Sequence, residues 1–215
     1  MANPELLSIL EEAKAVVFDF DGTLVDSNSI KWEAFEQLFL DFPENKEEID
    51  RYCREGNHTP RWEKFRHVYE KILGLPYTPE VEDSLLKRYE EATTRQIVEA
   101  PEIPGAAQFL AKAALRYETA LLSSTPHEIL LAIVRRKGWE GCFKEVRGAP
   151  VQKAPWLKGF RRERNLRKEQ MLFIGDTLED LEAAREAEIA FLQMGSELSD
   201  LTELNKLDWE NGLRR

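Results

Sequence analysis

Two aspartates separated by one residue lie at the end of the first apolar run of the chain. Asp19 and Asp21 follow residues 15–18 in the sequence VVFDFDGTLVDS, and a glycine and a threonine come directly after them. An apolar run that stops in acids and a glycine predicts a buried strand that carries charge to the edge of a sheet. Carboxylates at close range repel one another, and a hard divalent cation with oxygen ligands, Mg²⁺ above all, offsets that repulsion. The structural alternative is a strand end followed by an ordinary Asp-Gly hairpin turn.

Other polar residues lie close to the ends of later predicted strands. They are Ser123 and Ser124 after a predicted strand at 118–122, Lys153 before a predicted helix at 155–165, and Asp176 and Asp180 after a predicted strand at 171–174. In an open parallel sheet, ligands bind beyond the carboxyl ends of the strands. We therefore expect these acids, hydroxyls and a lysine to meet Asp19 and Asp21 at one edge of the sheet.

The spacing of apolar residues changes after the first predicted strand. An amphipathic helix is predicted at 4–13 and the strand at 15–20, and the region 28–98 then shows apolar residues at helical spacing with almost no β-type run. Glycine and proline breaks divide this region into four predicted helices, at about 28–40, 45–55, 60–73 and 78–98. We interpret it as a small helical bundle inserted after the first strand.

From residue 101 onward, predicted helices and strands alternate. In chain order they are a helix at 104–115, a strand at 118–122, a helix at 125–137, a strand at 143–147, a helix at 155–165, a strand at 171–174, a helix at 178–187 and a strand at 189–194. Thr125 and Thr177 are each expected to cap the helix that follows. Such alternation predicts a parallel sheet covered on both faces. The expected fold is α/β, with a Rossmann-like core of residues 1–27 and 99–215 and an inserted four-helix domain of residues 28–98.

The composition excludes several classes of protein. The 215 residues are 42% hydrophobic, enough for a substantial core, and the net charge of −10 repels nucleic-acid phosphate. A nucleic-acid partner is therefore not expected, and a phosphate ligand would need a local cation.

The N-terminal residues and the cysteines indicate the compartment. The first residues carry acids and lack the pattern of a secretory signal, and no apolar stretch reaches membrane-spanning length. Cys53 and Cys142 lie far apart in sequence, which favours reduced thiols over the alternative of a disulfide. We expect a soluble, cytoplasmic protein with no membrane partner.

Taken together, these segments resemble the four motifs of haloacid dehalogenase-superfamily phosphatases. FDFDGTLVDS resembles the first motif, LLSSTP the second, the lysine of QKAPWLKGF the third and FIGDTLEDLEAAREAEI the fourth. The resemblance covers about residues 1–27 and 99–195, and the region 28–98 lies where the family inserts its helical C1 cap. Ser123 and Lys153 are too close in sequence for the larger α/β cap that some relatives carry between these motifs.

The resemblance implies a role for each candidate acid. Asp19 would be the nucleophile that forms an aspartyl-phosphate, and Asp21 would be the general acid for the leaving group and then the base for water. Mg²⁺ would be held by Asp19, the backbone carbonyl of Asp21 and Asp176. Asp180 would hold a metal-bound water or orient Lys153. Taken alone, Asp180 is also explained as an acid that stabilises the start of a helix.

The resemblance also implies how the substrate is bound. The Ser123 hydroxyl and the Ser124 amide would bind phosphate oxygens, and Lys153 would supply the cation. Taken alone, a strand-end serine bonded to backbone and a solvated lysine are the structural alternatives. In the cap, the break at residues 56–62 would face the leaving group, with Arg61 and His58 as candidate specificity residues; a solvated side chain and a turn residue are the alternatives there.

These features predict a Mg²⁺-dependent phosphatase that acts on a small phosphorylated metabolite, such as a sugar phosphate, phosphoglycolate or a nucleotide. Asp21 argues against a dehalogenase or a phosphonate-cleaving enzyme, because those relatives lack an acid at the matching position. Two alternatives stay open: a sugar-phosphate mutase of the β-phosphoglucomutase type, which uses the same aspartyl-phosphate, and a phosphate-binding scaffold without turnover. The sequence leaves the oligomeric state open, with a monomer favoured.

Overall fold

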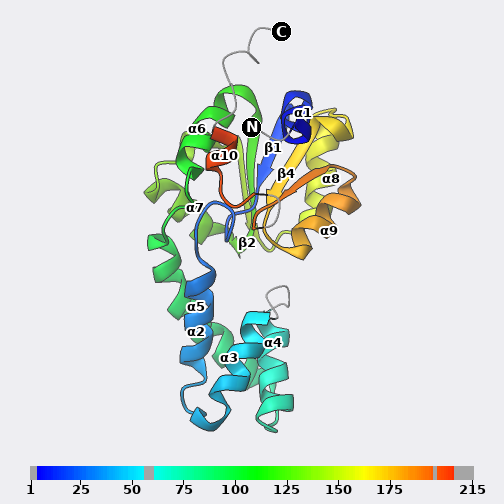
Figure 1. Ribbon diagram of the computed structural model, residues 1–215. Coiled ribbons are helices and arrows are strands. Elements are labelled where there is room, and N and C mark those ends of the chain that lie inside the picture. Colours follow the sequence, from blue (N-terminus) through cyan, green and yellow to red (C-terminus); the bar gives the residue numbers. More distant parts are fainter. Residues whose placement is uncertain (1–3, 56–60, 196–197, 206–215) are drawn as a thin grey trace. The chain divides into compact units, whose positions relative to one another are not determined.

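The computed structural model describes residues 4–55, 61–195 and 198–205 (Figure 1). The chain divides into two compact units: a sheet unit of residues Met1–Asp26 and Pro101–Arg215, and a helical unit of residues Ser27–Ala100. Each unit has a hydrophobic core of its own. Within the described residues, no helix combines the length and the apolar character that a membrane crossing requires.

The sheet unit is built on parallel strands in the order β3-β2-β1-β4-β5. They are β1 (Ala15–Phe18), β2 (Glu118–Pro126), β3 (Glu145–Ala149), β4 (Met171–Gly175) and β5 (Ala190–Gln193). Every residue of β1 is buried, which explains its continuous apolar run, since a central strand is covered on both faces. The predicted strand at 15–20 stops at Phe18, because the N–H groups of residues 23–25 all donate to the carbonyl of Phe20 and turn the chain.

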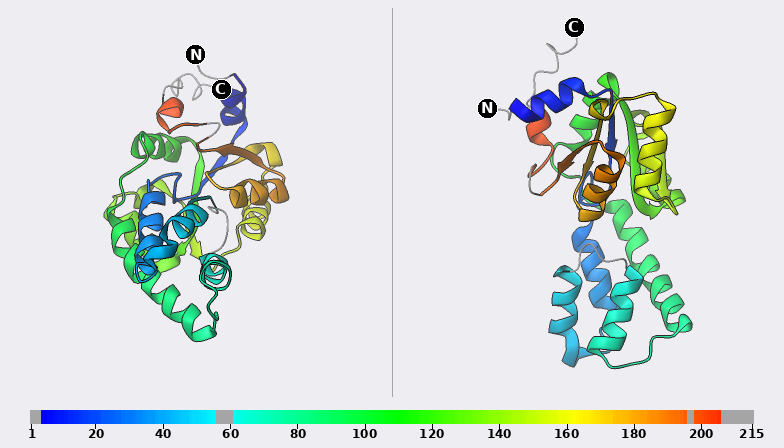
Figure 2. Two further views of the ribbon diagram at one scale, coloured as in Figure 1. Left: turned by 60° about the horizontal axis from the view of Figure 1, so that its bottom comes forward. Right: turned by 90° about the vertical axis from the view of Figure 1, so that its right-hand side faces the viewer.

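Helices cover both faces of the sheet (Figure 2). On one face, α8 (Lys153–Glu163) and α9 (Leu178–Ala187) contribute Leu157 and Ala184 to a core shared with Val17 and Phe173 of the sheet. On the other face, α6 (Ala106–Arg116) and α7 (His127–Arg136) cover the strands, and Phe18 meets Phe109 edge to face at a ring-centroid distance of 5.8 Å. The remaining elements of this unit are α1 (Pro4–Glu12), α10 (Thr202–Asn205) and 3₁₀ turns at Glu140–Cys142 and Lys168–Gln170.

The helical unit holds α2 (Asn28–Leu38), a 3₁₀ turn (Pro43–Asn45), α3 (Lys46–Glu55), α4 (Arg61–His67), a π-helical stretch (Val68–Ile72) and α5 (Pro79–Glu99). Its core is rich in aromatic side chains, and Phe65 packs against Phe35 at a centroid distance of 4.9 Å and against Tyr89 at 5.9 Å. The segment predicted as one helix at 60–73 changes from α to π geometry after His67.

The parallel sheet is covered by helices on both faces, and the helical unit is inserted in the chain after β1. This arrangement confirms the predicted fold class.

The strand register places the carboxyl ends of β1 and β4 beside Leu121 of β2, which continues to Pro126. Phe18 of β1 pairs with Leu121 of β2 and with Ile174 of β4. The N–H of Asp19 donates to the carbonyl of Ile174 at 2.8 Å. The residues that follow these strands therefore start from neighbouring positions at one edge of the sheet, where ligands of open parallel sheets bind.

Candidate active site

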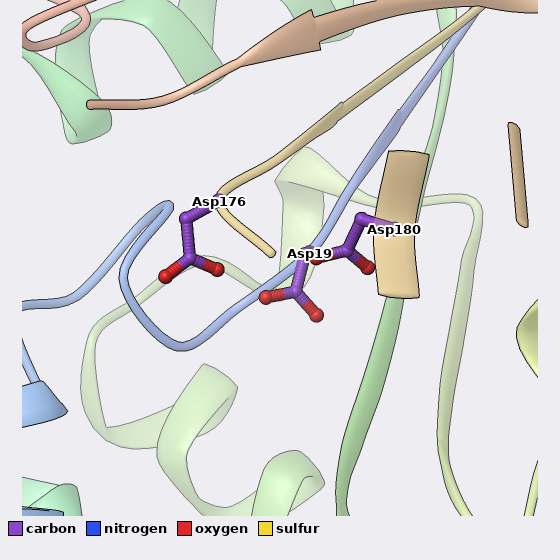
Figure 3. A group of neighbouring side chains, drawn as sticks. All are labelled: Asp19, Asp176 and Asp180. Carbon is purple, nitrogen blue, oxygen red and sulfur yellow. The ribbon is translucent and has the colours of Figure 1, made fainter. Parts of the chain in front are cut away.

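Three of the predicted acids converge at this edge. Asp19 follows β1, Asp176 follows β4, and Asp180 lies in the first turn of α9. One carboxylate oxygen from each lies within 4.8 Å of the others (Figure 3). Asp19 and Asp180 are buried, and Asp176 is partly buried. The acids that the sequence placed near the ends of two different strands thus form one group.

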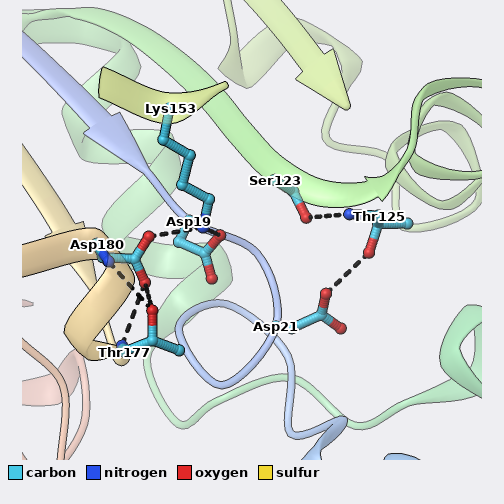
Figure 4. Close-up of polar contacts among 7 residues, drawn as sticks. All are labelled: Asp19, Asp21, Ser123, Thr125, Lys153, Thr177 and Asp180. Atoms are coloured by element: carbon cyan, nitrogen blue, oxygen red, sulfur yellow. Dashed lines mark hydrogen bonds and ion pairs between the residues drawn. The ribbon is translucent and has the colours of Figure 1, made fainter. Parts of the chain in front are cut away.

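Lys153, at the start of α8, contacts two acids of this group. It is buried, and its ammonium donates to Asp19 Oδ1 at 2.8 Å and to Asp180 Oδ1 at 2.6 Å (Figure 4). The prediction that Lys153 precedes its helix is wrong, because α8 begins at Lys153 itself. Pro155 is tolerated in this first turn, where a backbone N–H has no intrahelical partner, so the helix starts two residues earlier than predicted.

Burial and charge act on the ionisable groups in opposite directions. Burial raises the pKa of Asp19 well above its usual value, the Lys153 charge opposes this, and the neighbouring carboxylates raise the pKa further. Burial lowers the pKa of Lys153, but the charges of Asp19 and Asp180 and their hydrogen bonds outweigh it and raise that pKa overall. The Lys153 ammonium is therefore fully charged at neutral pH. Its positive charge lowers the pKa of Asp19, against the effect of burial.

Local structure at the end of β4 fixes the position of Asp180. Thr177 is the N-cap of α9 as predicted: its hydroxyl accepts the Asp180 N–H at 3.2 Å and donates to Asp180 Oδ2 at 2.6 Å. The Thr177 N–H also donates to Asp180 Oδ2, which completes a capping box. Gly175 leaves room for this arrangement, because a Cβ atom there would lie 2.7 Å from the Asp180 side chain.

The last residues of β2, which continues to Pro126 and does not end at the predicted residue 122, include the predicted phosphate-binding residues. Ser123 is buried and its hydroxyl accepts the Thr125 N–H at 3.0 Å, while Ser124 is exposed. The prediction that Thr125 caps the next helix is wrong: Pro126 occupies the N-cap of α7, with φ −51° and ψ 136°, and makes no side-chain cap bond. The Thr125 hydroxyl instead donates to Asp21 Oδ2 at 2.8 Å. The signal in the sequence was that Thr125 follows Ser123 and Ser124 just beyond the predicted strand at 118–122.

The Asp21 side chain is not part of the group of three carboxylates, although its charge contributes to the raised pKa of Asp19. The Asp21 side chain is turned toward Thr125 in Figure 4, whereas Asp19 and Asp180 both meet Lys153. A metal contact from Asp21 was predicted through its backbone carbonyl, and that role stays a prediction. The two acids of the first motif thus accept hydrogen bonds from different side chains, Asp19 from Lys153 and Asp21 from Thr125.

The two predicted specificity residues belong to the helical unit. Arg61 begins α4, and its guanidinium carbon lies 5.4 Å from the centroid of the Tyr89 ring within that unit. His58 lies outside the described residues. Their contact with a substrate stays a prediction.

The donor set at the sheet edge fits Mg²⁺. Three carboxylates supply hard oxygen ligands within 4.8 Å of one another, which is the chemistry that this cation prefers in proteins. Lys153 neutralises part of their charge, and a bound divalent cation would neutralise more of it. Cation binding should therefore stabilise the folded chain.

We expect MgCl₂ to raise the melting temperature of the protein, because a cation held by the folded group of carboxylates would not bind the unfolded chain. At about 100 times the Kd the gain is about 2.7 kcal/mol, or ~5–10 °C for a chain of this size. Differential scanning calorimetry with and without EDTA measures it, with NaCl of equal ionic strength as the salt control. Asp176→Asn should remove the shift, whereas Asp83→Asn on the exposed face of α5 should keep it. A full shift in Asp176→Asn would contradict this assignment.

Comparison with known proteins assigns the family. Residues 16–194 match the family model described as haloacid dehalogenase-like hydrolase. No curated protein is matched by the sequence.

Solved structures share the fold at low sequence identity. A predicted phosphoglycolate phosphatase from Haemophilus somnus 129pt is 21% identical with a TM-score of 0.68, over 86% of each chain. A putative β-phosphoglucomutase from Thermotoga maritima is 22% identical with a TM-score of 0.63, over 93% of this chain and 96% of that one. CbbY from Rhodobacter sphaeroides in complex with phosphate is 18% identical with a TM-score of 0.64, over 92% and 91%. Since the family model spans most of the sequence and the sheet brings the acids of its first and fourth motifs together, this chain belongs to the haloacid dehalogenase-like hydrolases.

Proposed function

We propose that this protein is a Mg²⁺-dependent phosphatase that hydrolyses a small phosphate monoester through an aspartyl-phosphate. The observation that carries the proposal is the buried contact of Lys153 with Asp19, inside a group of three carboxylates. In a chain with a net charge of −10, the Lys153 ammonium lies beside Asp19, the predicted nucleophile. An anionic phosphoryl group would arrive at this position and would be attracted by that charge.

In the proposed mechanism Asp19 attacks phosphorus with a carboxylate oxygen. The bond between phosphorus and the ester oxygen breaks, and Asp21 gives its proton to that leaving oxygen. Asp21 then takes a proton from a water molecule, which attacks the phosphorus of the aspartyl-phosphate and releases inorganic phosphate and the Asp19 carboxylate. Lys153, the Ser123 hydroxyl and the Ser124 amide would bind the phosphoryl oxygens during both steps.

The metal would be held by Asp19, Asp176 and the backbone carbonyl of Asp21, with Asp180 acting through a water molecule or through Lys153. When bound, it supplies positive charge that offsets the repulsion between the carboxylates and the phosphoryl group. The contact of Asp180 with the Lys153 ammonium at 2.6 Å, from the start of α9, supports the second of these roles.

The helical unit is proposed to act as the cap that excludes water and selects the leaving group. We take residues 28–98 as this cap and residues 1–27 and 99–215 as the catalytic core, with Arg61 and His58 as the residues that would contact the substrate. The protein is proposed to be cytoplasmic, because Cys53 and Cys142 are free thiols, as is usual in a reducing compartment. Its net charge of −10 favours a free metabolite over nucleic acid as the substrate.

A panel of phosphorylated metabolites tests the proposal. Sugar phosphates, phosphoglycolate and nucleotides are incubated with the purified protein, and released phosphate is measured with MgCl₂, with EDTA, and with EDTA followed by excess MgCl₂. We expect release from at least one compound, its loss with EDTA and its recovery with Mg²⁺. Conversion of a hexose 1-phosphate to its 6-phosphate without phosphate release would support the mutase instead. No turnover of any compound, or release that persists in EDTA, would contradict the proposal.

A further inference from the structure

A contact that the predicted motifs do not include joins β2 to the first motif. The Thr125 hydroxyl donates to Asp21 Oδ2 at 2.8 Å across 104 positions of sequence. Both side chains are nearly buried, with 7% of Thr125 and 8% of Asp21 exposed. Burial strengthens a hydrogen bond of this kind, because water does not compete for either partner. The contact therefore restricts the rotation of the Asp21 carboxyl group.

The backbone that carries Thr125 is itself held in place. The pairing of β2 with β3 shifts register between Leu122 and Pro126. The Gly148 N–H of β3 donates to His127 Nδ1 at 3.2 Å. At Gly148 a Cβ atom would lie 2.4 Å from the carbonyl oxygen of Thr125, so only glycine allows the two segments to approach this closely. Because threonine is also β-branched and stiff at χ1, its hydroxyl has a well-defined direction.

The same short segment carries the predicted phosphate-binding groups. The Thr125 N–H donates to the Ser123 hydroxyl at 3.0 Å, so the anchor of Asp21 and the first of the two serines are connected directly (Figure 4). A group that transfers a proton must lie within hydrogen-bond reach of the atom that receives it. A displacement of about 1 Å at such a group costs on the order of 10²-fold in rate.

We propose that Thr125 is a positioning residue, whose hydroxyl holds the Asp21 carboxyl group at a fixed place relative to the phosphate-binding segment for proton transfer to the leaving oxygen. This inference rests on the proposed phosphatase function. It adds to that function a residue of β2 that contacts the Asp21 side chain and, in the proposal, does not contact the phosphoryl group.

The test compares substrates that differ in their need for a proton. Thr125→Val removes the hydroxyl and keeps the branched shape. An alkyl monoester from the metabolite panel releases a basic alkoxide, which needs a proton, whereas p-nitrophenyl phosphate releases a stable anion. We expect kcat/KM for the alkyl ester to fall roughly 10- to 100-fold, a part of the 10²–10⁴ that general acid–base catalysis contributes. The value for p-nitrophenyl phosphate should change by less than about threefold, and Thr125→Ser should restore the alkyl ester to near the wild-type value.

Thr119→Val is the matched control. Thr119 lies in the same strand, is buried, and donates its hydroxyl to the Cys142 carbonyl, away from the proposed site. This variant should leave the ratio of the two kcat/KM values unchanged. Urea unfolding midpoints show whether each variant is folded, and Thr125→Ala replaces Thr125→Val if the valine variant does not fold.

The outcomes separate the inference from the proposed function. If the wild-type protein releases phosphate but Thr125→Val lowers both substrates equally, or Thr125→Ser fails to restore the alkyl ester, the positioning role is overturned. If the wild-type protein releases phosphate from neither substrate, the phosphatase proposal itself fails and takes the inference with it.

Discussion

Asp19→Asn is expected to reduce phosphate release by at least about 10³-fold, since removing a nucleophile costs several orders of magnitude. The amide has nearly the shape of the carboxylate but cannot attack phosphorus. The folded protein should not lose stability, because burial raises the pKa of Asp19 and so already disfavours its charged form. We therefore expect an inactive protein whose urea unfolding midpoint is equal to or higher than that of the wild type. Phosphate release is measured with MgCl₂ on the best substrate of the panel.

Two further measurements make this result specific to the nucleophile. Asp83→Asn makes the same chemical change on the exposed face of α5 and should leave phosphate release unchanged. Acid-quenched wild-type protein should carry a phosphoryl adduct detectable by mass spectrometry, and the Asp19→Asn protein should carry none. Phosphate release by Asp19→Asn within about tenfold of the wild type would show that another group attacks phosphorus.

Lys153→Met is expected to have the largest effect on stability. Methionine has a similar length but no charge, so Asp19 and Asp180 lose the cation that both contact. Removing one partner from a buried ion pair costs about 3–5 kcal/mol, because the remaining charges stay buried without compensation. In EDTA, we expect the melting temperature to fall by roughly 6–20 °C. Loss of the cation should also reduce phosphate release by about 10²–10³-fold, the effect of removing one electrostatic stabiliser of the transition state.

The helix that carries Lys153 offers its own control. Lys158 lies one turn and a half further along α8, and it makes an exposed ion pair with Glu186 at 2.7 Å. Lys158→Met should cost less than about 1 kcal/mol, because exposed ion pairs contribute little. Adding Asp180→Asn to Lys153→Met should recover part of the lost stability, since it removes one of the uncompensated charges. If Lys153→Met is as stable in EDTA as Lys158→Met, the lysine does not support the buried acids.

Features that depend on neighbouring residues were predictable from the sequence. The apolar run before Asp19 predicted a buried strand, and the strand exists at Ala15–Phe18. Thr177 was predicted to cap a helix at 178–187, and α9 has those bounds and that cap. In both cases the signal is local, because a strand face and an N-cap are set by residues within a few positions of one another. The rule that ligands bind beyond the carboxyl ends of parallel strands then predicted which acids should meet.

The partners of individual side chains were decided by the tertiary structure. Lys153 bridges Asp19 and Asp180 across 134 and 27 positions, and nothing in its own segment distinguishes it from a solvated lysine. Thr125 has the residue type of a helix cap, and the sequence therefore predicted a cap. Its hydroxyl donates to Asp21 instead.

The physical reason is that a hydroxyl bonds to whichever acceptor the packed chain brings within reach. At Thr125 that acceptor depends on the pairing of β1 with β2 and on the register shift after Leu122. The sequence by itself predicted the succession of strands and helices along the chain and that Asp19, Asp176 and Asp180 meet at one edge of the sheet. Which acid each cation and hydroxyl contacts was settled only when distant strands were aligned, because that alignment is a property of the whole sheet and not of any segment.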